Sequence, residues 1–137
     1  MEIKIKRGSS IPAHGTMEAA GYDIAATETV MIKPGGVVRV HTGLRLQMPP
    51  GAHALLIGRS SMGSRELLVF PAIIDSDYRG EIMVQVINLG HNDERLIMDG
   101  DRIAQLVFME HEDVDMIPVD ELDETERGSG GFGSTGA

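Results

Sequence analysis

Short apolar runs, each alternating with polar residues and each stopped by Pro or Gly, constrain the fold of this chain more than any other feature. Period-two alternation between turn residues is typical of β-strands, because successive side chains of a strand point to opposite faces of its sheet. We therefore expect many short strands. They cover residues 2–6, 30–32, 38–40, 44–48, 53–57, 67–70, 81–89, 95–98, 102–110 and 116–119.

Helical patterns are nearly absent, and only residues 61–66 could form a helical turn. The run over residues 82–89 is apolar on both faces apart from Gln85 and Asn88, so we expect it to be buried on both sides. A chain of 137 residues has the usual length of one domain. Many short strands with frequent turns predict an all-β domain, either a β-sandwich of the jelly-roll type or a small barrel.

The formal net charge of −9 is concentrated near the C-terminus. Residues 110–126 hold nine acidic residues and no Lys or Arg, whereas twelve acidic and twelve basic residues balance in the rest of the chain. Nucleic acid binding requires a basic surface that displaces counterions, so we expect no nucleic acid partner. A small anionic substrate is compatible with this charge, because a few Arg side chains and backbone N–H groups can hold phosphate.

The chain has no Cys, which excludes disulfides and Cys-based zinc sites. No run approaches the roughly 20 apolar residues that span a bilayer. Residues 1–7 lack the apolar block of a signal peptide. We therefore expect a soluble, cytoplasmic protein without a membrane partner.

The last segment, residues 127–137, consists almost entirely of Gly, Ser and Thr, with Arg127 and Phe132 as the main exceptions. By composition this segment is a flexible tail. The alternative interpretation is a lid over a nucleotide. In such a lid, backbone N–H groups and Arg127 hold phosphate while Phe132 stacks on a base.

Two internal segments carry candidate chemistry. Gly58-Arg59-Ser60-Ser61 follows an apolar run, and its guanidinium and hydroxyl groups could hold phosphates. Alternatively, a Ser caps a helical turn beside a surface Arg. Asp75 directly follows Ile73-Ile74, so its carboxylate should lie where a buried strand emerges, where it could take a proton from water. The alternative there is an acidic turn without a catalytic role.

Five segments, taken in order, resemble the five motifs of the trimeric dUTPase family (dUTP pyrophosphatases). The likeness extends from about residue 12 to residue 136, and its third and fifth motifs are highly specific. The motifs are Ala20-Gly21-Tyr22-Asp23, Gly58-Arg59-Ser60-Ser61, the run from Ile74 to Glu81, the run from Gly100 to Leu106, and the run from Arg127 to Gly136.

The resemblance implies a jelly-roll-like all-β subunit, a homotrimer, and active sites to which three chains contribute. One chain would supply the first, second and fourth motifs, another the third motif, and the last its tail. Residues 1–126 would form the β domain, and residues 127–137 a flexible Gly-rich arm that closes over the site. The implied reaction is Mg²⁺-dependent hydrolysis of dUTP to dUMP and pyrophosphate, which limits uracil incorporation into DNA and supplies dUMP for dTMP synthesis.

The resemblance also implies residue roles. Asp75 would activate the water that attacks the α-phosphorus, and Asp23 would be an outer-shell partner of Mg²⁺, reached through water. Tyr78 would pack against deoxyribose and exclude a 2′-hydroxyl. The other substrate contacts would be Ala72 and Ile74 in the uracil-binding hairpin, Arg59, Ser60, Ser61 and Gln105 on the phosphates, Arg127 on the γ-phosphate, Phe132 on uracil, and Gly133, Ser134 and Thr135 in the tail.

The chain departs from the family pattern in the uracil-binding hairpin. Ala72 replaces the usual Gly three residues before Asp75, and Phe70-Pro71 replaces small residues, so position 71 offers no N–H. The bulk of Phe70 could narrow the pocket or pack beneath it. Glu66 also replaces a common Gly, which predicts a slightly different loop.

Two rival functions share this fold. The dCTP deaminases resemble the chain at Arg59-Ser60-Ser61 and at Ile74-Asp75, but they carry a catalytic Glu on the strand after the third motif. This chain has Gln85 there, and an amide cannot shuttle a proton. A non-enzymatic interaction or regulatory protein is the second rival, because a fold does not guarantee activity.

Overall fold

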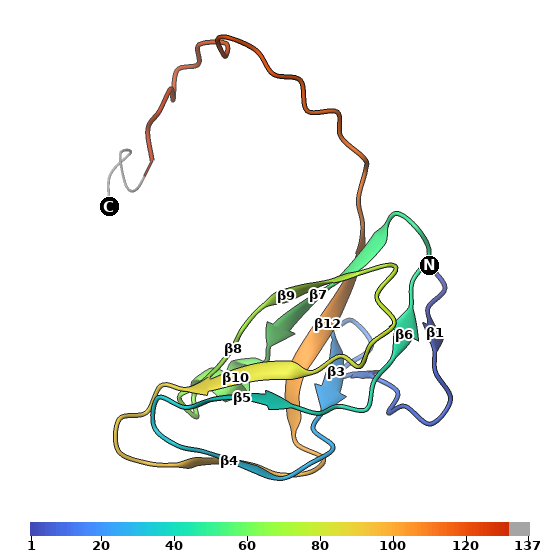
Figure 1. Ribbon diagram of the computed structural model, residues 1–137, viewed down its shortest axis with the longest axis vertical. Helices are drawn as coiled ribbons and strands as arrows, with labels where there is room; N and C mark the ends of the chain where they lie inside the picture. Colours follow the sequence, from blue (N-terminus) through green and yellow to red (C-terminus); the bar gives the residue numbers. More distant parts are fainter. Residues whose placement is uncertain (132–137) are drawn as a thin grey trace.

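Short strands make up nearly all regular structure in the computed structural model, which describes residues 1–131 (Figure 1). This confirms the predicted all-β fold. The elements are β1 (Lys4–Ile5), β2 (Ala13–His14), β3 (Tyr22–Ala25), β4 (Val30–Ile32), β5 (Val37–Val40), β6 (Leu46–Gln47), β7 (Ala52–Gly58), α1 (Ser60–Gly63), β8 (Leu67–Val69), β9 (Ala72–Asp75), β10 (Val84–Asn88), β11 (Arg95–Ile97) and β12 (Arg102–Glu110).

Two sheets carry the candidate site. The larger has the spatial order β2-β3-β12-β7-β9, with β12 at its centre and β9 at one edge. The smaller has the order β5-β10-β8, and both of its strand pairs are antiparallel. Two further ribbons, β1-β6 and β11-β4, complete the body. The long strand β12 spans residues 102–110 as predicted, because nine residues of alternating pattern pair on both sides with β3 and β7.

The core consists of the apolar side chains that the strands direct inward. Strand β10 supplies Val84 and Val86, both fully buried, and β12 supplies Leu106. Burying an aliphatic side chain of this size contributes about 1.5–3 kcal/mol, so the alternating residues of these strands hold the body together. The largest fully buried side chains are Ile32, Leu44, Leu56, Met62, Leu67, Ile82, Ile97, Ile103 and Leu106.

The outer face of the β5-β10-β8 sheet carries several exposed apolar side chains beside the paired residues Arg39 and Gln85. Val37, Leu68, Met83 and Leu89 are all exposed, and Leu89 keeps 53% of its surface accessible. The prediction that residues 82–89 are buried on both sides is therefore wrong for one chain, because Met83 and Leu89 are exposed on the second face. Exposed apolar side chains that gather on one face of a sheet often mark a contact surface, so this face is a candidate for one.

The turn between α1 and β8 contains Glu66, which replaces the Gly that is common in the family at this position. Its φ of 57° lies in the left-handed region that favours glycine, at a steric cost of about 1–2 kcal/mol for an L-residue. The loop therefore keeps a glycine-type turn despite the larger side chain. The Glu66 carboxylate pairs with the guanidinium of Arg95, which anchors the turn to β11.

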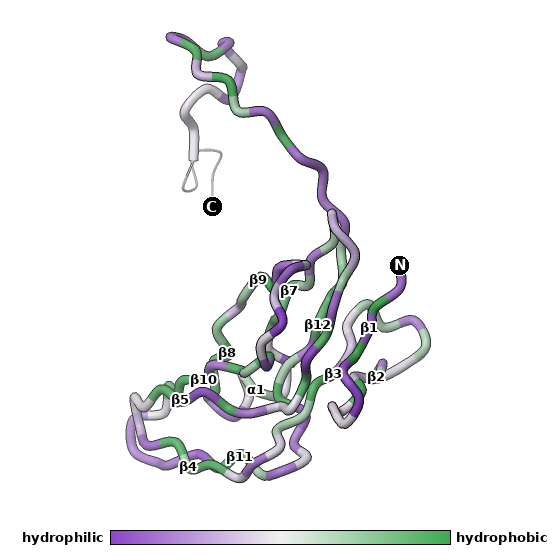
Figure 2. Tube along the Cα trace, turned by 45° about the vertical axis from the view of Figure 1, so that its right-hand side comes forward, coloured by the Kyte–Doolittle hydropathy of each residue, from purple (hydrophilic) through white to green (hydrophobic). Residues whose placement is uncertain are grey.

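The last part of the described chain is an extended arm (Figure 1). Strand β12 ends at Glu110, His111 still donates a backbone hydrogen bond to Gly51, and residues 111–129 are exposed throughout. Apolar and charged residues are interspersed along this arm (Figure 2), and Met116 is 89% exposed. The strand predicted over residues 116–119 is wrong, because no strand within residues 1–131 pairs with the arm. The predicted division at residue 126 stays a prediction.

Within residues 1–131, no helix reaches the length and hydrophobicity that crossing a bilayer would require.

Candidate active site

Asp23 holds two guanidinium groups at one end of the larger sheet. Its carboxylate, only 9% exposed, lies in β3 beside the central strand. The distance from Oδ1 to Nε of Arg59 is 3.0 Å, and that from Oδ2 to Nη1 of Arg102 is 3.3 Å. One negative charge thus balances only one of two fixed positive charges. The cluster keeps a net positive charge and spare N–H donors, which suits phosphate oxygens. Arg102 lies in the fourth motif but was not among the residues predicted to contact the substrate.

Gln105 joins this cluster through strand register. It lies opposite Asp23 in the β3–β12 pair, and side chains of directly opposed residues share one face of a sheet. Gly21 makes room for it: a Cβ at position 21 would lie 2.9 Å from Cδ and 3.2 Å from Cβ of Gln105. Any larger residue at position 21 would displace the Gln105 amide from this end of the sheet.

Ser60 and Ser61 begin the four-residue α1 that follows β7. The residue at the helix N-cap is Arg59, whose backbone is extended and whose side chain makes no capping hydrogen bond. The alternative interpretation, a Ser cap beside a surface Arg, is therefore wrong, because the Arg59 guanidinium is paired with Asp23. Both Ser residues are exposed next to Arg59, so two hydroxyls border the positive cluster.

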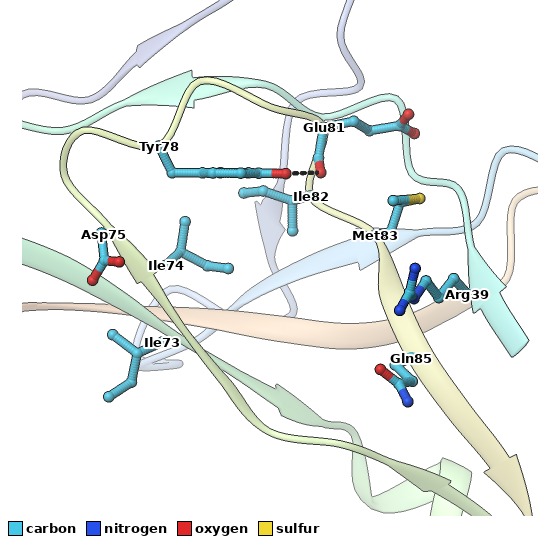
Figure 3. Close-up of a pocket in the computed structure, with 9 residues that line it drawn as sticks. All are labelled: Arg39, Ile73, Ile74, Asp75, Tyr78, Glu81, Ile82, Met83 and Gln85. Atoms are coloured by element: carbon cyan, nitrogen blue, oxygen red, sulfur yellow. Dashed lines mark hydrogen bonds between the residues drawn. The ribbon is translucent and has the colours of Figure 1, made fainter. Parts of the chain in front are cut away.

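A second group of predicted residues surrounds an open pocket of about 260 Å³ (Figure 3). Asp75 is the last residue of β9, and its carbonyl accepts a hydrogen bond from the backbone N–H of Tyr78. The Tyr78 ring lies across the pocket, and its hydroxyl donates to the carbonyl of Glu81 at 2.9 Å. A Cβ at Gly80 would overlap the phenol, so only glycine allows this ring position. Ile74 also lines the pocket.

The expected burial of the strand before Asp75 is wrong for the single chain. Strand β9 is an edge strand, paired only with β7, and Ile73 is 66% exposed. The hairpin residues that depart from the family pattern, Phe70, Pro71 and Ala72, are exposed and lie outside the lining of the pocket. Phe70 instead donates a backbone hydrogen bond to Gln85.

The two groups of residues lie at opposite ends of β7. Asp75 pairs with His53 near the start of β7, whereas Arg59 directly follows its end. Six residues of extended strand separate positions 53 and 59, which corresponds to about 20 Å at 3.3 Å per residue. The single chain therefore brings Asp23, Arg59 and Gln105 together and, separately, Asp75, Ile74 and Tyr78, but it does not join the two groups.

The predicted tail residues are described only in part. Arg127 is exposed on the arm, where its Nε donates to the carbonyl of Gly130 at 3.0 Å. The predicted contacts Phe132, Gly133, Ser134 and Thr135 lie outside the described residues.

The carboxylates of the site fit an indirect magnesium contact better than a protein cage. Within the described part of the chain, no three His, Asp or Glu side chains gather as metal ligands do. Mg²⁺ commonly keeps several waters and binds through one or two carboxylates plus substrate phosphates. Both oxygens of Asp23 are already paired with guanidinium groups. A hydrated magnesium ion held mainly by phosphate oxygens of a ligand would therefore fit this donor set.

Comparisons with known proteins agree on one family. The family model described as dUTPase matches residues 7–136. The deoxyuridine 5'-triphosphate nucleotidohydrolase of Desulfitobacterium hafniense is 41% identical, covering 98% of this chain and 92% of its own, and that of Nautilia profundicola is 43% identical, covering 99% of both. A mutant dUTPase of Staphylococcus bacteriophage 80alpha, solved with dUpNHpp, has 26% identity and a TM-score of 0.90 over 99% of both chains. This chain belongs to the dUTPase family.

Proposed function

We propose that this protein hydrolyses dUTP to dUMP and pyrophosphate, with Mg²⁺ as cofactor, in active sites shared between the subunits of a homotrimer. The supporting observation is the placement of Arg59 and Asp75 about 20 Å apart at the two ends of β7. In this proposal, the group around Arg59 binds the phosphates and the group around Asp75 binds the nucleoside. The two groups form a complete site only when they come from different chains. Relatives with 41–43% identity carry the name deoxyuridine 5'-triphosphate nucleotidohydrolase.

Asp75 is the general base in this proposal. Its exposed carboxylate takes a proton from a water molecule, and the water oxygen forms a bond to the α-phosphorus. The bond from the α-phosphorus to the oxygen that bridges to the β-phosphorus breaks, and pyrophosphate leaves with that oxygen. The proton on Asp75 then passes to solvent, which restores the base.

The pocket beside Asp75 holds the nucleoside in this proposal. The backbone of the hairpin, with Ala72 and Ile74, lies next to uracil, while the Tyr78 ring packs against deoxyribose. The hydroxyl bond to Glu81 and the close fit against Gly80 fix that ring. A ribose 2′-hydroxyl would meet the fixed ring, so UTP fits less well than dUTP.

The triphosphate lies on the positive cluster of a neighbouring chain. Arg59, Gln105 and Ser61 contact phosphate oxygens, and the Ser60 hydroxyl donates to the bridging oxygen as negative charge develops there. Bound magnesium supplies further neutralisation of phosphate charge. Asp23 orients Arg59 and faces the hydrated ion. The arm of a third chain closes the site, with Arg127 on the γ-phosphate, Phe132 on uracil, and Gly133, Ser134 and Thr135 as further donors.

The uncovered face of the β5-β10-β8 sheet supports assembly. Its exposed Val37, Leu68 and Leu89 form the kind of apolar surface that subunit interfaces bury, whereas Met83 lines the pocket beside Asp75. Phe70 lies next to this face at the end of β8 and is also partly accessible. Covering the face by neighbouring copies would bury β10 on both sides, in agreement with its sequence pattern.

A substrate panel tests the proposed reaction. Purified protein with Mg²⁺ is given dUTP, dTTP, dCTP or UTP, and both pyrophosphate and ammonia are measured. We expect pyrophosphate from dUTP at least about a hundredfold faster than from the other nucleotides, with loss of the activity in EDTA. Ammonia from dCTP would identify a deaminase instead. No product from any nucleotide would favour a non-enzymatic protein.

A further inference from the structure

His41 and Glu81 form an ion pair beside the nucleoside pocket. His41 directly follows β5, and Glu81 lies in the segment that leads into β10. Nδ1 of His41 is 3.1 Å from both carboxylate oxygens of Glu81, and the side chains are 53% and 19% exposed. The carboxylate of Glu28 accepts a hydrogen bond from the backbone N–H of His41 at 2.8 Å. Glu81 therefore contacts the imidazole itself, while Glu28 contacts the backbone of the same residue.

The carboxylate of Glu81 is held by neighbours of His41 as well. The backbone N–H groups of Gly43 and Thr42 donate to its Oε1 at 2.9 and 3.2 Å. The Gly43 bond, followed by the bond to His41, lowers the pKa of Glu81. The hydrogen bond with Glu81, followed by attraction between the charges, raises the pKa of His41 above 6.5. Glu81 stays ionised near neutral pH, so only the charge of His41 changes there.

Residue 81 also sets the position of the Tyr78 ring. The backbone carbonyl of Glu81 accepts the Tyr78 hydroxyl at 2.9 Å (Figure 3), and the missing side chain of Gly80 leaves the space that the phenol ring occupies. Arg45 donates to the carbonyl of Arg79, so two guanidinium groups also belong to this turn. The residue whose carboxylate pairs with His41 thus also accepts the Tyr78 hydroxyl through its backbone carbonyl, so one residue links the ion pair to the aromatic ring.

We propose that His41 is a positioning residue that, when protonated, holds Glu81 and thereby keeps Tyr78 in place for the deoxynucleoside. This inference rests on the proposed function of the Tyr78 pocket. Neutral His41 keeps a weaker hydrogen bond to Glu81 but loses the charge attraction. Affinity for the nucleotide is then complete below pH 6.5 and falls as the pH rises through the pKa of His41.

Steady-state kinetics with three proteins test the inference. The KM for dUTP is measured from about pH 6 to about pH 9 for the unmodified protein, His41→Gln and His41→Lys. We expect the KM of the unmodified protein to rise several-fold more than that of His41→Lys, whose charge persists over this range. His41→Gln should have the higher KM already at pH 6. Titration of dUTP itself affects KM equally in all three proteins. The test therefore compares how KM depends on pH in one protein with its pH dependence in the others.

A spectroscopic readout separates this inference from the proposed reaction. Tyr22 and Tyr78 are the only tyrosines, and the chain has no Trp, so the fluorescence of a Tyr22→Phe protein reports Tyr78 alone. Without substrate, the fluorescence of the Tyr22→Phe protein should change between pH 6 and 9. In a double variant that also carries His41→Lys, it should stay constant over the same range. His91→Gln, in the loop after β10, is the matched control and should keep the unmodified profile.

The outcomes are distinct. The inference would be overturned, even if dUTP is hydrolysed, by KM values with the same pH dependence in all three proteins. It would also be overturned by Tyr78 fluorescence whose pH dependence is the same with and without His41→Lys. If Tyr78 fluorescence depends on His41 but the protein releases no pyrophosphate, the link between His41 and Tyr78 is supported and the proposed function is overturned.

Discussion

The carboxylate of Asp75 lies at the exposed end of an edge strand. Its role can be tested by a substitution that replaces one carboxylate oxygen with nitrogen. Asp75→Asn keeps the size and shape of the side chain but removes its basicity. We expect turnover of dUTP to fall by at least about a hundredfold, because the attacking water loses its base. Nucleotide binding and oligomeric state, measured by calorimetry and sedimentation, should stay nearly unchanged.

Asp77→Asn provides the matched control, since Asp77 is exposed in the same turn and has no role in the proposed reaction. Its turnover should remain within about twofold of the unmodified protein, as expected for a surface substitution. Full activity of Asp75→Asn would show that another group activates the water.

The arm is the element whose removal separates catalysis from folding. Residues 111–129 are exposed throughout, so they contribute little to the core of their own chain. Deleting residues 127–137 should lower turnover of dUTP by at least about tenfold, because the closed site loses donors to the phosphates. The thermal midpoint should move by no more than about 2 °C, since residues 127–131, the described part of this segment, bury no side chain. A shortened protein with full activity would show that the arm does not close the site.

Strands in which apolar and polar residues alternate strongly could be predicted from the sequence. The strands with which they pair could not. The run over residues 102–110 forms β12 because its pattern repeats over nine residues. Tyr22–Ala25 forms β3 without such a pattern, because it pairs with β12 on one side and β2 on the other. Met116–Val119 has strand composition but no strand beside it in the chain. Pairing is a long-range property, so local periodicity identifies candidate strands and not their neighbours.

The same limit applies to the candidate site. Its residue types were found through resemblance to five motifs, but the pairing of Arg102 with Asp23 was not, because it requires β3 and β12 in register. Likewise, no local signal measures how far Arg59 lies from Asp75. That distance follows from the direction of β7 and its pairing with β9.

At the scale of the whole molecule, mixing two inactive variants tests whether sites are shared. Asp75→Asn lacks the base, and Arg59→Gln lacks a phosphate contact; each alone should have little activity. When equal amounts are unfolded together and reassembled, about a quarter of the sites in random trimers combine an intact Asp75 with an intact Arg59 from its neighbour. We expect about a quarter of the unmodified turnover.

The control is the same mixture without unfolding, in which subunits have not exchanged and activity should stay low. Activity that fails to recover after verified exchange would place Asp75 and Arg59 of one site in the same chain, which would contradict the proposed assembly.

The length of β7 has a consequence for newly made protein. Seven extended residues keep Asp75 of one chain far from Arg59 of the same chain. In the proposed assembly, a chain leaving the ribosome therefore cannot consume nucleotide until it has met its copies. The onset of catalysis then depends on subunit concentration, and dilution below the association threshold switches the enzyme off without any inhibitor.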